Sequence, residues 1–405
     1  MVRTLPLGLD EALNLTLDNI APLESEQVDL LDGLQQAVAQ DLCALVDSPS
    51  IDASLKDGYA VVSEDVNGAR KSSPIVLKLA GAMAAGGQLD VPVCPGTTVR
   101  VLTGAKIPPG ASAVVAEEFV SVDKEAVIFY KDAEPGRNIL PRSSDVAAGQ
   151  MVVARGSLLI PGLAGLLAAA GHNSIPVVRS PCVAVIATGD EVVAPGRPLA
   201  QGQLYASNMT TLAGWCRRYG LQTRLRVIKD DADEIFETIT HFNDTTDAIV
   251  TSGGAWTGDR DLVALILERL GWRQLFHRIR IGPGKAVGFG LLKGKPVFIL
   301  PGGPPSNLMG FLQIALPGLL KLAGHRHTGL PTIAVKLEHD LTGRFTDWTQ
   351  FIYGTLQKGD DLPLFRSLRG KSRLQSMAEA QAVAAIAEGK TMLAAGSIIN
   401  AQLLV

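Results

Sequence analysis

The sequence predicts a multidomain α/β protein with a parallel sheet that helices cover on both faces. Its 405 residues exceed what one hydrophobic core usually holds, so we expect several domains. Between residues 181 and 322, continuous apolar runs alternate with segments of helical periodicity, which is typical of a doubly wound sheet. Before and after this region, proline and glycine interrupt short β-like pieces, which indicates smaller β-rich domains.

The N-terminal region has helical periodicity. Residues 9–45 carry apolar positions at helical spacing, so we expect two amphipathic faces there. The first consists of Leu9, Ala12, Leu13, Leu17 and Ile20, and the second of Val28, Leu31, Leu34 and Val38. A β-rich region follows, with strands expected from Asp57 and at residues 75–80, 97–103, 113–119 and 126–130. Residues 161–170 return to helix, with Pro161 suited to the first turn.

The α/β region contains the clearest elements. We expect strands at residues 183–187, 222–228, 248–251 and 297–300, and helices at 210–219, 231–241, from 262 onward and at 308–322. The sheet region closes near Gly324. Residues 331–405 again show short strands with turns, which indicates a small barrel or sandwich. Ligands of parallel sheets bind beyond the carboxyl ends of the strands, so we expect the chemistry in the loops there.

Composition argues against several classes of function. The formal net charge of -3 gives no reason to expect nucleic acid or an anionic membrane as a partner. Cys43, Cys94, Cys182 and Cys216 form no Cys-x-x-Cys pair, so neither a zinc site nor a disulfide framework is expected. The N-terminus lacks an apolar core of signal-peptide length, and the broken apolar run 158–170 is too short to span a bilayer. We therefore expect a cytoplasmic protein with reduced thiols.

Polar and glycine-rich loops follow three of the expected strands. These loops contain Thr188-Gly189-Asp190-Glu191, then Ser252-Gly253-Gly254 with Asp259 and Asp261, and then Pro301-Gly302-Gly303. Backbone N–H groups at a glycine turn and a helix start bind phosphate well, and paired carboxylates can hold Mg²⁺ against it. The alternative is a plain strand-to-helix connection whose aspartates only cap the helix.

Other candidate residues are ambiguous by themselves. Lys285, in Gly282-Pro283-Gly284-Lys285, could hold an oxyanion or simply be solvated. Trp256 could stack on a flat ring or cover the edge of a core. Asp57, Thr103 and Asp145, in the β-rich region, each fit a turn.

A series of motifs runs along the whole chain. It comprises Asp57-Gly58-Tyr59-Ala60, Thr103-Gly104-Ala105, Thr188-Gly189-Asp190-Glu191, Ser252-Gly253-Gly254, Gly258-Asp259, Pro283-Gly284-Lys285, Leu300-Pro301-Gly302 and the stretch from Gly370 to Ala378. In order and spacing, this series resembles the molybdopterin molybdenumtransferase family, which includes the E domain of gephyrin. The resemblance implies a helical linker domain split between residues 1–45 and 146–178, and a β-rich insertion domain at 46–145. It further implies a molybdopterin-binding α/β domain at 179–326 and a C-terminal β-barrel at 327–405.

The resemblance also implies a reaction and the residues that carry it. The reaction is the Mg²⁺-dependent insertion of molybdate into adenylated molybdopterin with release of AMP. It would take place in a homodimer, with each site between the α/β domain of one subunit and the β-rich domain of the other. Catalytic roles are implied for Asp190, Glu191, Asp259 and Lys285, and Mg²⁺ coordination for Glu191, Asp259 and Asp261. The implied substrate-binding residues are Asp57, Thr103, Asp145, Thr188, Gly189, Ser252, Gly253, Gly254, Pro301, Gly302 and Ser376.

The sequence departs from the family pattern at five motif positions, namely Lys56, Ala206, Trp256, Gly282 and Gly303. Gly282 stands where the family has a lysine, which removes one positive charge. Two alternatives to the implied enzyme therefore stay open. One is a non-catalytic paralogue that binds a pterin or a nucleotide, and the other is a related transferase that uses tungstate.

Overall fold

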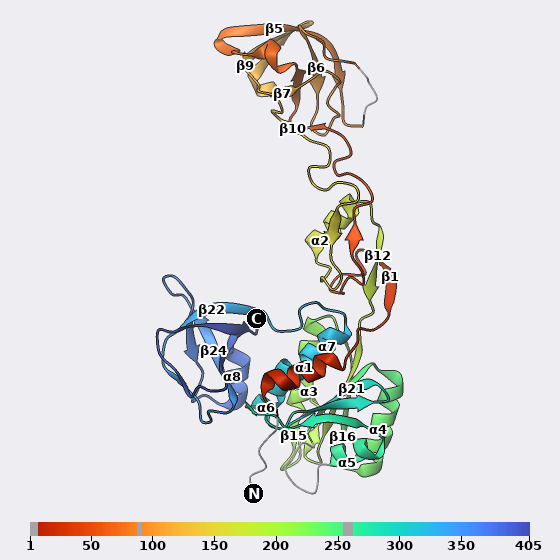
Figure 1. Ribbon diagram of the computed structural model, residues 1–405, viewed down its shortest axis with the longest axis vertical. Coiled ribbons are helices and arrows are strands. Elements are labelled where there is room, and N and C mark those ends of the chain that lie inside the picture. The colour runs from red at the N-terminus through yellow and green to blue at the C-terminus, as the bar shows by residue number, and fades with distance from the viewer. Residues whose placement is uncertain (1–6, 87–90, 254–261) are drawn as a thin grey trace.

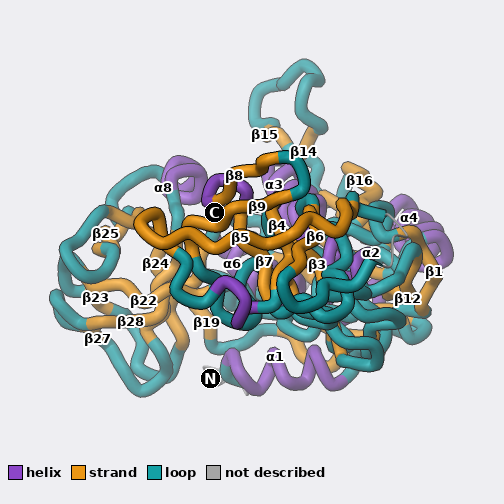
Figure 2. Tube along the Cα trace, turned by 90° about the horizontal axis from the view of Figure 1, so that it is seen from above, coloured by secondary structure: helices purple, strands orange, loops and turns teal. Residues whose placement is uncertain are grey.

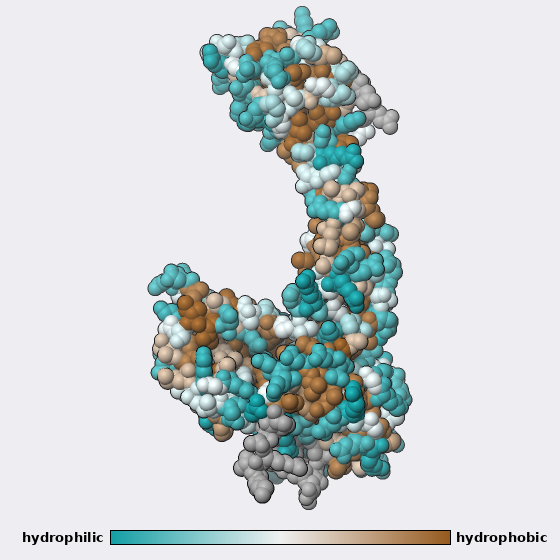
Figure 3. Space-filling view, in the orientation of Figure 1, coloured by the Kyte–Doolittle hydropathy of each residue, from teal (hydrophilic) through white to brown (hydrophobic). Residues whose placement is uncertain are grey.

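The computed structural model describes residues 7–86, 91–253 and 262–405. The molecule is elongated (Figure 1). At one end an α/β domain lies beside a β-barrel, and a narrow stalk connects them to a β-rich domain at the other end. A space-filling view shows the same narrowing at the stalk (Figure 3). In the ranges given above, no helix is long and apolar enough to cross a membrane.

A six-stranded sheet forms the centre of the α/β domain, in the order β16-β13-β17-β21-β20-β18. The first four run parallel, and β20 and β18 continue the sheet in antiparallel pairing. The strands are β13 (Cys182–Thr188), β16 (Gln222–Ile228), β17 (Ala248–Ser252), β18 (Arg273–His277), β20 (Gly288–Leu292) and β21 (Lys295–Leu300). Because β13, β17 and β21 are apolar along nearly their whole length, they occupy the inner positions that both layers of helices bury.

Helices cover both faces of this sheet. Val185 of β13 packs in the same core as α3, η3 and α7, whereas its neighbour Ile186 points to the opposite face and packs with α4 and α5. The helices are α3 (Ser207–Arg218), α4 (Ala232–Thr245), α5 (Leu262–Arg269), α6 (Pro304–Gly310), the π-helical turn η3 (Phe311–Ala315) and α7 (Leu316–Leu322). The doubly wound sheet predicted from the sequence is therefore confirmed.

The N-terminal helix belongs with this domain. α1 (Leu9–Asp18) packs on η3 and α7, and Ala12 lies in the core on that side of the sheet. A short parallel pair, β14 (Val192–Val193) and β15 (Leu204–Tyr205), extends the loop after β13. The connection between β14 and β15 projects from the body of the molecule (Figure 2).

The stalk contradicts the prediction of helix across residues 19–45. There β1 (Ser25–Asp29) pairs antiparallel with β12 (Ser174–Val178), and β2 (Leu42–Cys43) pairs with β11 (Met151–Val153). The backbone N–H groups of Asp32 and Gly33 both donate to Asp29 O, so the chain turns directly after β1. A strand followed by turns thus reproduced the spacing of an apolar helical face. The helix of the stalk comes instead from a later segment of the chain, α2 (Pro161–Ala169).

The outer domain is built on a second six-stranded sheet, in the order β7-β4-β6-β5-β9-β8. Its strands are β4 (Gly58–Val61), β5 (Arg70–Met83), β6 (Thr97–Val101), β7 (Ala113–Ala116), β8 (Val120–Asp123) and β9 (Ala126–Lys131). Two 3₁₀ turns, η1 (Ser63–Val66) and η2 (Glu117–Phe119), and the pair β3 (Ala53–Ser54) with β10 (Ile139–Leu140) complete it. The predicted β-rich insertion is therefore present.

The C-terminal region closes into a barrel, which settles the sequence-level choice between barrel and sandwich. β24, β25, β22, β28 and β26 pair in that order, and β26 pairs back with β24. The elements are β22 (Thr332–Leu337), β23 (Leu341–Thr342), β24 (Thr349–Gln357), β25 (Leu364–Ser367), α8 (Arg373–Glu379), β26 (Ala382–Ile386), β27 (Met392–Leu393) and β28 (Ile398–Leu403). β19 (Ile281–Gly282), from the α/β domain, pairs with β24 and joins the two domains.

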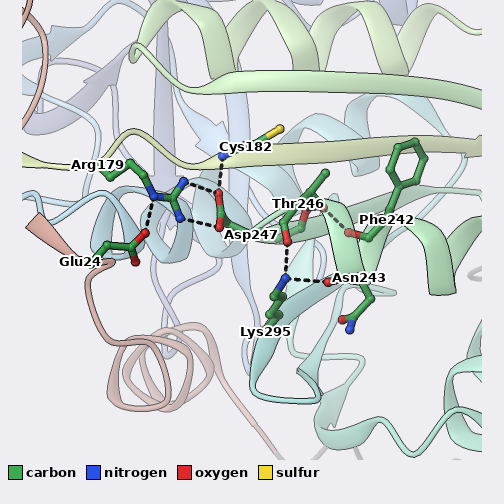
Figure 4. A network of polar contacts seen from close by, with 9 residues as sticks. Glu24, Arg179, Cys182, Phe242, Asn243, Thr246, Asp247 and Lys295 are labelled. Atoms are coloured by element: carbon green, nitrogen blue, oxygen red, sulfur yellow. Dashed lines mark hydrogen bonds and ion pairs between the residues drawn. The ribbon is translucent and has the colours of Figure 1, made fainter. Parts of the chain in front are cut away.

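A polar network anchors the stalk to the base of the sheet (Figure 4). Arg179 donates to both carboxylate oxygens of Asp247, at 3.0 and 2.8 Å, and to Glu24 at 2.6 Å. The N–H of Cys182 also donates to Asp247. Burial raises the pKa of Asp247, but the hydrogen bonds from Arg179 and Cys182 outweigh burial and leave this pKa below its usual value. Sequence reasoning did not identify this network.

Candidate functional site

Three predicted loops leave the sheet from adjacent strands at one edge. β13 ends at Thr188, β17 at Ser252 and β21 at Leu300. In the parallel register, Ala187 pairs with Ser252, and Ser252 pairs with Leu300, so the strand ends lie side by side. The loops that begin at Thr188, Gly253 and Pro301 therefore share the carboxyl edge of the sheet, where ligands of such folds bind.

The backbones of these loops approach each other closely. Gly253 has a φ of 109°, and a Cβ atom at this position would lie 2.5 Å from Thr188 O and 2.8 Å from Thr188 Oγ1. A Cβ atom on Gly302 would lie 3.9 Å from the Cα of Gly253. Only glycine fits at position 253, because both its backbone conformation and the contact with Thr188 exclude a side chain. Thr188 Oγ1 is itself buried and has no hydrogen-bond partner among the described residues.

Two asparagines at helix starts fix this edge. Asn208 donates to Gly302 O at 2.8 Å and to Ser252 Oγ at 3.3 Å. Asn307 is buried and donates to Ser252 Oγ and to Pro301 O, both at 2.9 Å. Sequence reasoning did not propose Asn208 or Asn307 as site residues. The available signal was an asparagine in the first turn of each helix that follows a loop at the sheet edge.

Acidic side chains gather beside the first loop. Asp190 and Glu191 are exposed, and the N–H of Asp230 donates to Asp190 Oδ1 at 3.3 Å. Burial raises the pKa of Asp230, and the negative charges of Asp190 and Glu191 raise it further. Asp230 follows β16, so a fourth strand end contributes an acid that the sequence did not single out.

Several predicted site residues lie outside the described residues, namely Gly254, Trp256, Asp259 and Asp261. Among the residues that are described, no group of three or more His, Cys, Asp or Glu is arranged to hold a metal ion. The donors present at the edge are nevertheless all oxygen atoms, from the carboxylates of Asp190, Glu191 and Asp230. Carboxylate oxygens are the ligand type that Mg²⁺ prefers, and the raised pKa of Asp230 reflects its burial and the negative charges of Asp190 and Glu191.

Lys285 lies at the same edge but reaches toward the barrel. The loop that carries it ends at Gly288, which pairs with Ile299 near the end of β21. Its Nζ lies 5.5 Å from the centre of the Trp348 ring, which precedes β24. A Cβ atom on Gly282 would lie 3.7 Å from the same indole. The aromatic ring of Trp348 thus occupies the space beside Gly282, where the family pattern has a lysine.

The remaining predicted residues do not join the sheet edge within one chain. Asp57 accepts hydrogen bonds from Thr103, at 2.6 Å from N–H and 2.7 Å from Oγ1, and these bonds lower the pKa of Asp57. This pair lies in the outer domain, at the opposite end of the molecule from the sheet (Figure 1). Asp145 is exposed where the outer domain meets the stalk, and its N–H donates to Ser48 O. Ser376, on α8, donates through Oγ to Leu368 O at 3.3 Å.

Two protein families match consecutive parts of this chain. Residues 7–171 match the family described as the MoeA N-terminal region (domain I and II), and residues 184–321 match a probable molybdopterin binding domain. The molybdopterin molybdenumtransferase of Haemophilus influenzae is 31% identical over 328 residues, which is 80% of each chain. Molybdopterin molybdenumtransferase 2 of Mycobacterium tuberculosis is 34% identical over 70% of this chain and 72% of the relative. The molybdopterin biosynthesis MoeA protein of Pyrococcus horikoshii OT3 superposes with a TM-score of 0.83 at 27% identity, covering 98% of this chain and 99% of that one.

Proposed function

Because the chain belongs to the molybdopterin molybdenumtransferase family, enzymes of molybdenum cofactor biosynthesis, we propose that its sheet edge inserts molybdate into adenylated molybdopterin and releases AMP. The observation that carries this proposal is the convergence of Thr188, Gly253 and Gly302 beside an acidic cluster. Bare backbone and a buried hydroxyl suit phosphate oxygens, and neighbouring carboxylates suit a cation that accompanies phosphate.

Each group of residues would have a role that follows from its chemistry. The backbone at Gly189, Gly253 and Gly302, with Thr188 Oγ1, would hold the pyrophosphate of the substrate. Asn208 and Asn307 would keep Ser252 and the Pro301–Gly302 turn in place, because both already bond to them. Asp190, Glu191 and Asp230, with Asp259 and Asp261 from outside the described residues, would hold Mg²⁺. When bound, Mg²⁺ would offset negative charge on the phosphates. Lys285 would supply a positive charge for molybdate from the barrel side of the edge.

A second copy of the chain would complete the site. Asp57, Thr103 and Asp145 lie too far along the molecule to reach their own sheet edge (Figure 1). Exposed apolar side chains follow the stalk and its junction with the outer domain, where brown patches are visible (Figure 3). They include Leu31 (78% exposed), Leu45 (62%) and Met151 (58%). Burying such side chains is the usual driving force of a symmetric dimer, so we propose a homodimer in which each outer domain covers the partner's sheet edge.

The experiment that tests the function supplies purified protein with adenylated molybdopterin, Mg²⁺ and either molybdate or tungstate. AMP release is measured in each mixture and with Mg²⁺ removed by chelation. The proposal predicts release that needs Mg²⁺ and is faster with molybdate. Faster AMP release with tungstate would show that tungstate is the preferred oxyanion. Binding of the substrate without release in any mixture would mean a non-catalytic binding protein.

A further inference from the structure

A groove of about 590 Å³ lies between the α/β domain and the barrel. One wall is α3, which presents Thr210, Thr211 and Trp215, and the opposite wall is α8, which presents Met377. Leu404, near the end of the chain, closes one side. Its volume lies within the range of small-molecule pockets, roughly 300–1,000 Å³. None of its lining residues was predicted as a site residue from the sequence.

The groove and the sheet-edge site share two helices, α3 and α6. Thr210 and Thr211 follow Asn208 on α3, and Leu308 on the groove floor directly follows Asn307 on α6. Asn208 and Asn307 are the two side chains that hold Ser252, Pro301 and Gly302. The same two helices therefore bring residues of the groove within one to three positions of the side chains that hold the loops.

The walls suit a flat ring. Trp215 stacks on Tyr219, with ring centres 6.4 Å apart and an interplanar angle of 18°, and the Arg218 guanidinium lies 5.1 Å from the Trp215 ring. Arg218 also donates to Leu404 O at 2.7 Å, which ties this wall to the end of the chain. Trp215 and Met377 give a polarisable apolar surface. The Thr211 hydroxyl donates to Ser207 O at 3.1 Å and can accept a further hydrogen bond from a ligand, and the Thr210 hydroxyl offers a second polar group. This combination matches a planar, nitrogen-containing heterocycle better than a sugar or an alkyl chain.

We propose that the groove between α3 and α8 binds a fused nitrogen heterocycle, the flat bicyclic ring that purines and pterins share, while the phosphates of the same ligand lie on the sheet edge. This inference rests on the proposed function, because that function supplies a substrate with phosphates between an adenine and a pterin. It adds the place where one of the two rings is held and the residues that hold it.

Gly214 provides a direct way to fill the groove. It lies on α3 among the lining residues, and a Cβ atom added there would meet no atom within 4 Å. A Gly214→Leu side chain would therefore project into the groove without a clash, and replacing a helical glycine adds up to about 1 kcal/mol of helix propensity. Gly165→Leu on α2 is the matched control, since its Cβ atom also meets nothing within 4 Å.

Binding of AMP, of 6-hydroxymethylpterin and of inorganic pyrophosphate is measured by calorimetry on the wild-type protein and both variants, in the presence of Mg²⁺. We expect Gly214→Leu to weaken AMP or the pterin at least about tenfold and to leave pyrophosphate unchanged, with Gly165→Leu like wild type on all three. The probe that loses affinity identifies which ring the groove takes. Wild-type affinity of Gly214→Leu for both ring compounds, or no binding of either to the wild-type protein, would overturn the inference. Failure of the proposed function would appear separately, as no AMP release by the wild-type protein.

Discussion

The sheet edge and the outer domain each contain a carboxylate and a threonine, but the pKa values of the two carboxyl groups shift in opposite directions. In the outer domain, Asp57 receives two hydrogen bonds from Thr103, and its pKa is lowered. At the sheet edge, Asp230 faces Asp190 and Glu191, and its pKa is raised by burial and by their charges. Thr188 Oγ1, beside that edge, has no hydrogen-bond partner among the described residues. The outer pair is satisfied by its own domain, whereas the edge would gain from a cation and a hydrogen-bonding ligand.

The two regions also differ in their position in the molecule. The edge is assembled from four strand ends of a single sheet, whose buried register holds them together. The outer pair is joined by two hydrogen bonds but lies at the far end of the molecule (Figure 1). The sheet edge and the outer pair can therefore contribute to one site only if they come from different copies of the chain.

The largest expected effect comes from removing charge at the edge. Glu191→Gln should lower Mg²⁺-dependent AMP release by about 100-fold or more, which corresponds to roughly 2.7 kcal/mol of lost transition-state stabilisation. Glu237→Gln, an exposed acid on α4, is the matched control and should leave the rate unchanged. Wild-type activity of the Glu191→Gln variant would show that Glu191 has no role in the reaction.

The outer domain should show a smaller effect of the same kind. Asp57→Asn keeps the size of the side chain but weakens its acceptance of both Thr103 hydrogen bonds, so we expect AMP release to fall about 10-fold to 100-fold. The melting temperature should change little, because Asp57 is exposed. An unchanged rate of AMP release would show that Asp57 of the outer domain does not contribute to the reaction.

Arg179 tests the connection between the stalk and the sheet. Arg179→Met removes the charged hydrogen bonds to Asp247 and Glu24, which should lower the free energy of unfolding by about 2 kcal/mol. The depressed pKa of Asp247 gives stability that is present above its unfolded pKa, near 3.9, and lost as the pH falls through the folded pKa. The difference between wild type and Arg179→Met, measured by urea titration, should therefore be full at neutral pH and shrink in acid. A difference independent of pH would mean that packing rather than charge explains it.

The smallest effect on stability is expected at Thr188. Thr188→Val replaces a buried hydroxyl that has no partner among the described residues, so the free energy of unfolding should change by less than about 1 kcal/mol. Pyrophosphate affinity should nevertheless fall, because the hydroxyl would contact phosphate. Unaltered pyrophosphate binding would place the ligand elsewhere on the edge.

The sequence predicted the sheet best, because its signal is local. β13 was predicted at residues 183–187 and is observed at Cys182–Thr188, because a buried parallel strand is a short apolar run that ends at turns. The stalk was predicted wrongly because β1 pairs with β12, far along the chain, and nothing near residue 25 reveals that partner. Asp230, Asn208 and Asn307 were missed because polar residues at helix starts look like ordinary caps.

Two further features depend on tertiary contacts that no motif encodes. The Nζ of Lys285 lies 5.5 Å from the ring of Trp348, which comes from the barrel rather than from the sheet. The pairing of Asp57 with Thr103 requires β4 and β6 to be neighbours, whereas each residue alone fits a turn. Motif order located these residues along the chain, but only the fold shows which of them meet.

In the proposed dimer, the sheet edge of one copy works with the outer domain of another. The most direct measurement mixes Glu191→Gln and Asp57→Asn protein, each less active than wild type by about 10-fold or more, and assays AMP release after their subunits have exchanged. In a random mixture of homodimers, about half of the dimers combine the two variants, and each of these has one intact site, so activity should recover to about a quarter of wild type. No recovery after demonstrated exchange would contradict the claim, because a site built within a single copy cannot be repaired by its partner.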